Sequence, residues 1–244
     1  MANWSDPRSV GAAPAGDVGA RSAAVDAGLR SYMLSVYNYM GSGVLLTGIV
    51  ALLFASSGAA QSIMMSPGIL KWVIMLSPLA FILVMNFGIN RMSTFTLQAC
   101  FWGFATVMGL SMSTIFLVYT GASIAQTFFA TSAAFAGLSL WGYTTKKDLS
   151  GMGTFLIMGV VGLLVASIIN IFMQSGTMNL VISFVGVLLF AGLTAYDTQR
   201  IKSMYSYVAG TDMVGKTVIM GALSLYLDFI NMFQFLLSFL GNRD

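Results

Sequence analysis

Charged residues are so widely spaced in this chain of 244 residues that they leave long uncharged runs. The runs hold 40 residues after Arg30, 19 after Lys71, 54 after Arg91, 48 after Asp148 and, interrupted only by Asp228, 26 after Lys216. A helix needs about 20 apolar residues to cross a bilayer. Only 8% of the residues are charged, against about 25% in a soluble domain. The chain is therefore predicted to be a helical membrane protein.

Polar turns that contain glycine divide the longest runs. Residues 120–123 split the run of 54, and residues 174–177 split the run of 48. The prediction is an all-α membrane protein with seven transmembrane helices, in which residues 31–244 form one domain. The predicted spans are 33–55, 71–90, 96–119, 123–143, 153–173, 178–199 and 217–240. Residues between the first two spans form an external connection.

The distribution of Lys and Arg predicts the orientation. If the N-terminus is cytoplasmic, nine basic residues lie inside and only Lys71 and Arg243 lie outside. This asymmetry follows the positive-inside rule, so the C-terminus is expected outside. The net charge of +3 needs no nucleic acid to explain it. Seven spans leave no room for a soluble catalytic domain, so the chain is not expected to be an enzyme.

Residues 1–30 differ from the rest, because they are rich in Ala, Gly and Ser and carry scattered charges. They are predicted to form a flexible cytoplasmic tail. The apolar run that starts near Tyr32 begins too late and is too long for a signal peptide. The single cysteine, Cys100, lies in the third span, so no disulfide forms within the chain.

Two aspartates, Asp197 and Asp228, lie in or at the end of otherwise uncharged spans. A carboxylate at bilayer depth costs roughly 2.5–3.5 kcal/mol on insertion scales, so such residues indicate an ion or proton pathway. Two neighbouring carboxylates cannot easily both ionise, and they share a proton. The two acids are therefore predicted to be partners in a pH-sensitive pathway.

The seventh span carries its small and polar residues on one side. On a helical wheel, this stripe holds Thr217, Gly221, Ser224, Asp228 and Asn231. In a membrane bundle such a stripe faces protein or a water-filled cavity. Asp228 lies about 11 residues, or roughly 16 Å, from the inner end, whereas Asp197 lies near the end of its span. The acids can meet only if the sixth helix extends inward or water penetrates.

The second span ends in polar residues that are candidates for the same site. Arg91 either competes for one of the acids or acts only as a positive-inside anchor. Asn86 and Asn90 are one helical turn apart and are expected to line an inner vestibule.

Structural roles for the two acids are alternatives to the pH-sensitive pathway. Asp197 would then be an interfacial acid near Arg200, and Asp228 a polar clasp between helices.

Several segments carry a family resemblance. The segment Ala-Leu-Ser-Leu-Tyr-Leu-Asp-Phe-Ile-Asn-Met-Phe at 222–233 resembles the last-helix motif of the transmembrane Bax inhibitor motif family. Residues 195–202, 146–150 and 170–172 resemble the end of its sixth helix, its loop between helices four and five, and the end of its fifth helix. The resemblance runs from about Tyr32 to the C-terminus and suggests a prokaryotic-type member. It implies two three-helix layers around a central seventh helix.

The resemblance also implies a function: a pH-sensitive calcium leak. It implies that Asp197 and Asp228 form a hydrogen-bonded sensor pair, with Arg91 as the partner on the second helix. The chain departs from the family in having Met92 and Ser93 after this arginine, where a longer basic cluster is expected, and in having no glutamate. The Ala- and Gly-rich tail, without an endomembrane retrieval signal, favours a bacterial inner membrane.

Calcium is chemically reasonable as the transported ion. It prefers six to eight oxygen ligands, which Asp197, Asp228, Ser224, Asn231 and water would supply only in part. Weak, transient binding suits a leak, because the ion must also leave. Calcium and protons are thus the expected small partners, and no cofactor is expected.

Three other classes compete with the leak. A proton-coupled cation exchanger needs much the same parts, because a shared-proton pair is also a proton relay. An intramembrane aspartyl protease also uses two helix-borne acids. Its second motif has Gly-x-Gly-Asp, whereas residues 225–228 read Leu-Tyr-Leu-Asp, which is bulky and closed. A non-transporting regulator would bind another membrane protein, such as a membrane-anchored protease.

Overall fold

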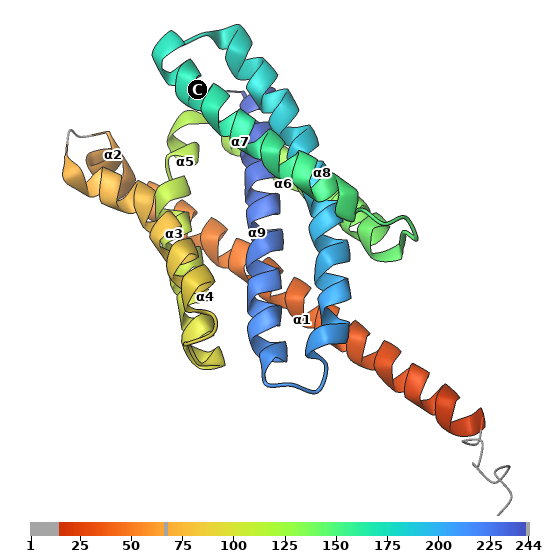
Figure 1. Ribbon diagram of the computed structural model, residues 1–244. Coiled ribbons are helices and arrows are strands. Elements are labelled where there is room, and N and C mark those ends of the chain that lie inside the picture. The colour runs from red at the N-terminus through yellow and green to blue at the C-terminus, as the bar shows by residue number, and fades with distance from the viewer. Residues whose placement is uncertain (1–14, 66–67, 243–244) are drawn as a thin grey trace, which may run out of the picture.

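The computed structural model describes residues 15–65 and 68–242, and all the regular secondary structure in them is helical (Figure 1). The helices are α1 (Ala15–Ser56), α2 (Ala59–Met64), α3 (Ile69–Gly88), α4 (Thr94–Met112), α5 (Ile115–Val118), α6 (Gly121–Thr144), α7 (Ser150–Met173), α8 (Gly176–Val208) and α9 (Met213–Leu240). Within this part of the chain, seven segments are long and apolar enough to span a membrane, with α4 and α5 counted as one. The predicted fold class is therefore confirmed.

The C-terminal helix α9 lies at the centre of the bundle (Figure 1). It packs against α1, α4, α6 and α8. Half of its most apolar segment is buried, against 11% for the corresponding segments of α3 and α7. Helices α1, α3 and α4 pack together on one side of it, and α6, α7 and α8 on the other. Two three-helix layers thus enclose α9, as the resemblance implied.

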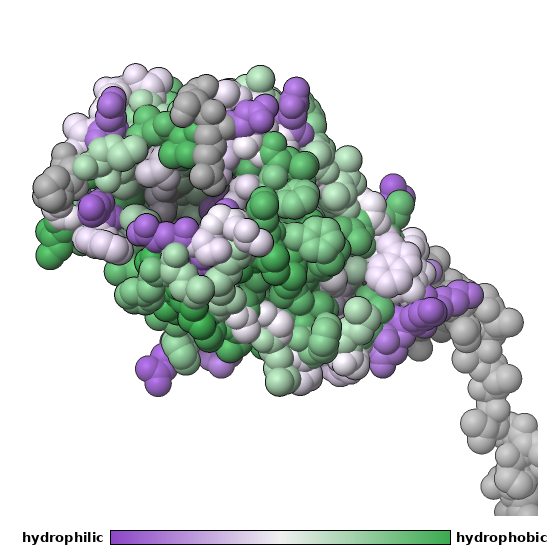
Figure 2. All heavy atoms as spheres, turned by 90° about the horizontal axis from the view of Figure 1, so that it is seen from above, coloured by the Kyte–Doolittle hydropathy of each residue, from purple (hydrophilic) through white to green (hydrophobic). Residues whose placement is uncertain are grey.

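The outer surface of the bundle is strongly apolar. Figure 2 shows broad green, apolar areas on the visible surface. Aromatic side chains on outer helices project fully outward, with Phe155 71% exposed and Phe87 and Phe172 both 83% exposed. Exposed apolar area on this scale marks a surface that faces lipid or other proteins.

Two helices extend beyond their predicted limits. Helix α1 begins at Ala15, so residues 15–30 are helical where a flexible tail was expected, and residues 1–14 lie outside the described part. The many alanines of this stretch favour helix intrinsically. Helix α8 continues past residue 199 to Val208. Its extension is held because Ile201 is buried and the Tyr205 ring lies 5.3 Å from that of Tyr32.

Two smaller differences concern the third span and the first connection. The third span is broken between α4 and α5, where the Ser113 hydroxyl donates to the Leu110 carbonyl. Such a local side-chain bond competes with the helical ladder. The connection after α1 contains the short helix α2, whose Ala60 and Met64 are buried.

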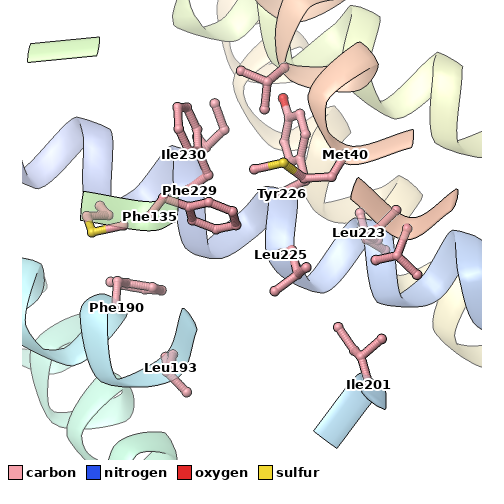
Figure 3. Packing of buried hydrophobic residues seen from close by; sticks show 14 of the residues in the cluster. Met40, Phe135, Phe190, Leu193, Ile201, Leu223, Leu225, Tyr226, Phe229 and Ile230 are labelled. Carbon is pink, nitrogen blue, oxygen red and sulfur yellow. The ribbon is translucent and has the colours of Figure 1, made fainter. Parts of the chain in front are cut away.

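The core gathers around the middle of α9. Figure 3 shows Tyr226 beside Met40 of α1, and Phe229 beside Phe135 of α6. The ring centroids of Phe229 and Phe135 are 5.6 Å apart. Tyr226 packs edge-on against Phe104 of α4 at 5.0 Å. Side chains from both layers therefore pack against the middle of α9, around Tyr226 and Phe229.

Candidate functional site

Helices α8 and α9 form an antiparallel hairpin joined by residues 209–212 (Figure 1). Asp197 lies 11 residues before the end of α8, and Asp228 lies 15 residues after the start of α9. At 1.5 Å per residue they lie roughly 16 and 22 Å from the hairpin loop. The two carboxyl groups are close enough to interact electrostatically. The extension of α8 therefore brings Asp197 to nearly the depth of Asp228.

A cavity of about 180 Å³ lies between α3, α8 and α9 at the end of the bundle that holds this loop. Its polar lining consists of Asn86, Asp197, Arg200, Thr217 and Ser224. Gly221 also lines it, and a Cβ atom there would lie 3.1 Å from the Ile201 side chain of α8. The small residue thus lets α8 and α9 approach closely beside the cavity.

Asp228 lies one helical turn beyond Ser224, deeper than the residues that line the cavity. Its side chain is only 4% exposed, and its Oδ2 atom has no hydrogen-bond partner among the described residues. Asp197 is half-buried at the cavity wall. The described side chains form no hydrogen bond between the two acids, so their coupling in this state is electrostatic.

The basic residue beside Asp197 is Arg200. It follows Asp197 by three residues on α8, lines the same cavity and interacts electrostatically with its carboxyl group. Arg91 is exposed in the turn after α3 and does not line the cavity. The spacing of three residues on a helix was a visible signal for Arg200, because such residues share one face.

The two asparagines of the second span are separated. Asn86 lines the cavity, and its side-chain amide donates to the Ile82 carbonyl at 2.9 Å. Asn90 lies in the exposed turn, because α3 ends at Gly88. The expectation that both line one vestibule is therefore met for Asn86 alone.

The polar stripe of α9 also divides at Asp228. Thr217, Gly221 and Ser224 line the cavity. Asn231, one turn beyond Asp228, is half-buried, and its amide donates to the Leu227 carbonyl at 2.7 Å. Of the predicted calcium ligands, Asp197 and Ser224 line the cavity, and Asp228 and Asn231 do not.

An aromatic cluster lies beyond Asp228, on the side away from the hairpin loop. The Phe128 ring lies 5.7 Å from Phe229 and 6.3 Å from Phe233, and Phe135 also packs on Phe229. On the α1 side, Thr47 donates to the Ala105 carbonyl, so the Tyr226 hydroxyl donates the 2.6 Å bond to Thr47. The cavity lining does not extend to these rings, which instead border a separate apolar pocket of about 310 Å³ between α1, α6 and α9.

Three polar side chains that the sequence did not single out fix the connections at the loop end. The Lys216 ammonium donates to the Ile89 carbonyl at the end of α3, and the Lys202 ammonium donates to the Tyr143 carbonyl near the end of α6. Gln199 accepts from the Leu149 amide and donates to the Lys147 carbonyl. Basic groups often satisfy the last carbonyls of helices in this way. No pattern in the sequence pairs these residues.

The arrangement offers few ligands for a tightly held metal. Residues 25–65 and 68–242 contain no group of three or more His, Cys, Asp or Glu side chains that would hold an ion. The cavity instead combines one carboxylate with the oxygens of Asn86, Thr217 and Ser224. Oxygen donors of this kind suit a hard cation that keeps much of its water. The arrangement therefore suits weak, reversible binding of a hydrated cation better than tight retention of a metal ion.

Comparisons with known proteins give a consistent result. The family model described as "Inhibitor of apoptosis-promoting Bax1" matches residues 29–244. An uncharacterised protein of Rickettsia prowazekii is 48% identical over 219 residues, which cover 89% of this chain and 92% of that protein. An uncharacterised protein of Caulobacter vibrioides is 46% identical over 233 residues, which cover 90% of this chain and 92% of that protein. The inner membrane protein YbhL of Escherichia coli is 41% identical over 219 residues, with 89% and 94% covered.

Proposed function

Since this chain belongs to the Bax inhibitor family and is an integral, multi-pass membrane protein, we propose that it is a pH-sensitive calcium leak channel gated by Asp197 and Asp228. One observation carries the proposal. The cavity reaches Asp197 from the loop end and stops one turn short of Asp228, whose Oδ2 atom is buried without a partner. Carboxylates at this depth are costly and are typically kept for ion or proton movement.

The pH response follows from the coupling of the two acids. Carboxyl groups that interact release their protons in steps that belong to the pair. Each step changes the charge between α8 and α9, and with it the repulsion across the hairpin. Arg200 is the cation placed to compensate Asp197 when the pair ionises. In this proposal, Arg200 takes the role that the resemblance gave to Arg91.

Calcium is the proposed cargo. The carboxylate of Asp197, with the oxygens of Ser224, Thr217 and Asn86, gives a partial ligand set for a hydrated divalent ion. Weak binding allows release, which conduction requires. Passage beyond Asp228 then needs movement of the aromatic cluster around Phe229.

We further propose that the loop end faces the cytoplasm and that the protein lies in a bacterial inner membrane. The loops and helix ends there carry Arg30, Arg91, Lys146, Lys147, Arg200, Lys202 and Lys216. This excess fits the positive-inside rule. The relative YbhL is described as an inner membrane protein.

The test is calcium flux into proteoliposomes that contain the purified full-length chain, scanned from about pH 5 to 8. Asp197→Asn and Asp228→Asn should each flatten the pH dependence, because each removes one titrating member of the pair. Asp148→Asn is the matched control, since it changes an exposed acid at the same end of the bundle. It should leave the profile unchanged.

Absence of flux above empty liposomes at every pH would sink the channel proposal. That result would favour a non-transporting regulator, in which Asp228 acts as a polar contact that holds helices together. Flux that requires an opposing proton gradient would instead indicate a proton-coupled cation exchanger.

A further inference from the structure

A groove of about 510 Å³ runs between α1 and α6. Both helices pack against α9, but they do not pack closely against each other. The groove is lined by Met33, Leu34, Tyr37, Phe135, Ala136 and Leu140, with Arg30 at one end. None of these residues takes part in the cavity at Asp197.

We propose that this groove binds one anionic phospholipid, with an acyl chain along its apolar wall and the phosphate at Arg30. The groove lies within the candidate membrane spans of α1 and α6 and is open to the outside of the bundle, so in a bilayer it would face lipid. Hydrocarbon is the medium available to fill an apolar hollow on such a surface. A helix is about 10–12 Å wide and would enter such a groove only in part, whereas a single acyl chain can lie along its wall.

The charge at the mouth of the groove selects the headgroup. Arg30 is exposed and has no ion-pair partner in the described part of the chain. Lys202 lies 4.7 Å above the ring of Tyr143, which also lines the groove, and provides a second positive charge nearby. The one acid close by on α1 is the exposed Asp26, a turn before Arg30. Basic residues between helices at this level attract anionic headgroups.

The wall of the groove is connected to α8 by a directed chain of hydrogen bonds. The Thr198 hydroxyl donates to the Thr194 carbonyl, so the 2.9 Å bond from Ser139 to Thr198 must be donated by Ser139. The Tyr37 hydroxyl then donates to Ser139, also at 2.9 Å. Thr198 directly follows Asp197 on α8. A lipid packed on Tyr37 would therefore contact one end of a hydrogen-bond chain whose other end is the buried Thr198 on α8, which does not line the cavity.

The test is native mass spectrometry of the full-length chain released from vesicles of equal parts phosphatidylglycerol and phosphatidylcholine. The wild-type protein should retain one phosphatidylglycerol in preference to phosphatidylcholine. Arg30→Gln should lower this preference about fivefold, as expected for loss of one cation near an anionic lipid surface. Arg91→Gln is the matched control, because Arg91 is an exposed arginine at the same end but lies outside the groove. It should keep the preference.

A second pair of variants tests the groove without changing charge. Ala136→Trp fills the groove and should abolish lipid retention. Ala134→Trp changes an exposed alanine of α6 that does not line the groove, so it should leave lipid retention unchanged. Equal retention of the two lipids by the wild type would overturn the proposal. So would equal effects of Arg30→Gln and Arg91→Gln, lipid retention by Ala136→Trp at the wild-type level, or a second copy of the chain retained in place of the lipid. These readouts do not depend on ion flux, so they stand apart from the channel proposal.

Discussion

The two halves of α9 on either side of Asp228 have opposite surroundings. Toward the hairpin loop, Thr217, Gly221 and Ser224 face a cavity with a polar lining. On the other side, Phe229 and Phe233 are buried in an aromatic cluster and are 4% and 6% exposed. Both halves belong to one unbroken helix. The difference therefore comes from the side chains and from the helices that cover them.

This contrast explains how a membrane protein can carry an acid at its centre without an open pore. Small residues on the first half leave space that water can enter as far as Asp197. Large rings on the second, packed half border a separate apolar pocket of about 310 Å³, which Thr47, Phe128, Phe229 and Phe233 line, so the polar cavity does not continue past Asp228. In the proposed leak, an ion would have to pass from the cavity half into the packed half at the level of Asp228.

The largest expected effect concerns the packed half. Phe229→Ala removes a buried ring from its contacts with Phe128 and Phe135. It should lower the free energy of unfolding by about 3–5 kcal/mol, as for large-to-small core changes. Ser224→Ala, in the cavity half, should change it by only about 0.5 kcal/mol. Unfolding by SDS in mixed micelles measures both. Similar losses for the two variants would show that the halves are packed alike.

The next effect concerns the boundary between the halves. Asp228→Leu replaces a buried carboxyl group, whose Oδ2 atom has no partner, with an apolar side chain of similar size. It should raise the free energy of unfolding by about 1–3 kcal/mol, the cost of an unsatisfied buried polar group. Asp197→Leu should raise the free energy of unfolding by less, because Asp197 is half-buried and lines the cavity.

The same micelle unfolding experiment separates a functional acid from a structural clasp. A loss of stability in Asp228→Leu that exceeds the change in Asp197→Leu would identify Asp228 as a polar clasp. The buried carboxyl group of Asp228 would then be explained by its contribution to stability, without a role in transport.

Most of the fold could be predicted from the sequence, because bilayer thickness fixes the length of each span. The uncharged runs locate all seven spans, and the polar stripe of the last one indicates a helix packed on many sides. The extension of α8 could not be predicted in this way. Residues 203–208 include two serines and two tyrosines, which hydropathy reads as a loop. Beyond the bilayer a helix needs no apolar run, and here Tyr205 packs on Tyr32.

The acidic residues of the site could be predicted from the sequence, but the place of its basic residue could not. Asp197 and Asp228 stand out because charge is costly at this depth. The prediction for Arg91 rests on its position near the end of the second span. A shift of the helix end by a few residues decides whether such a side chain faces the bundle or the solvent, and α3 ends at Gly88. The place of Arg200 follows from the depth that α8 reaches, which tertiary packing sets.

The smallest expected effect concerns an acid outside the bundle. Asp148 is exposed in the loop between α6 and α7 and accepts a 2.9 Å hydrogen bond from the Ser150 amide. Hydrogen bonds from the side chain and backbone of Ser150 lower the pKa of Asp148 below its ordinary value of 3.8. The fold therefore favours the ionised form. Its contribution is present above that value and is lost as the pH falls through the lowered pKa.

Hydrogen exchange at the first turn of α7 measures this contribution. Protection there should stay constant from about pH 8 to 5 and fall only in stronger acid. Asp148→Asn should lower the protection slightly at neutral pH and remove the acid-dependent step. A step between about pH 5 and 8 that Asp148→Asn abolishes would contradict this assignment. Such a step would also make Asp148 a competitor to the buried pair as the source of any pH response in the flux. Without it, Asp148 is excluded as the source of a pH-dependent flux in that range, and the Asp197→Asn and Asp228→Asn variants then test the buried pair directly.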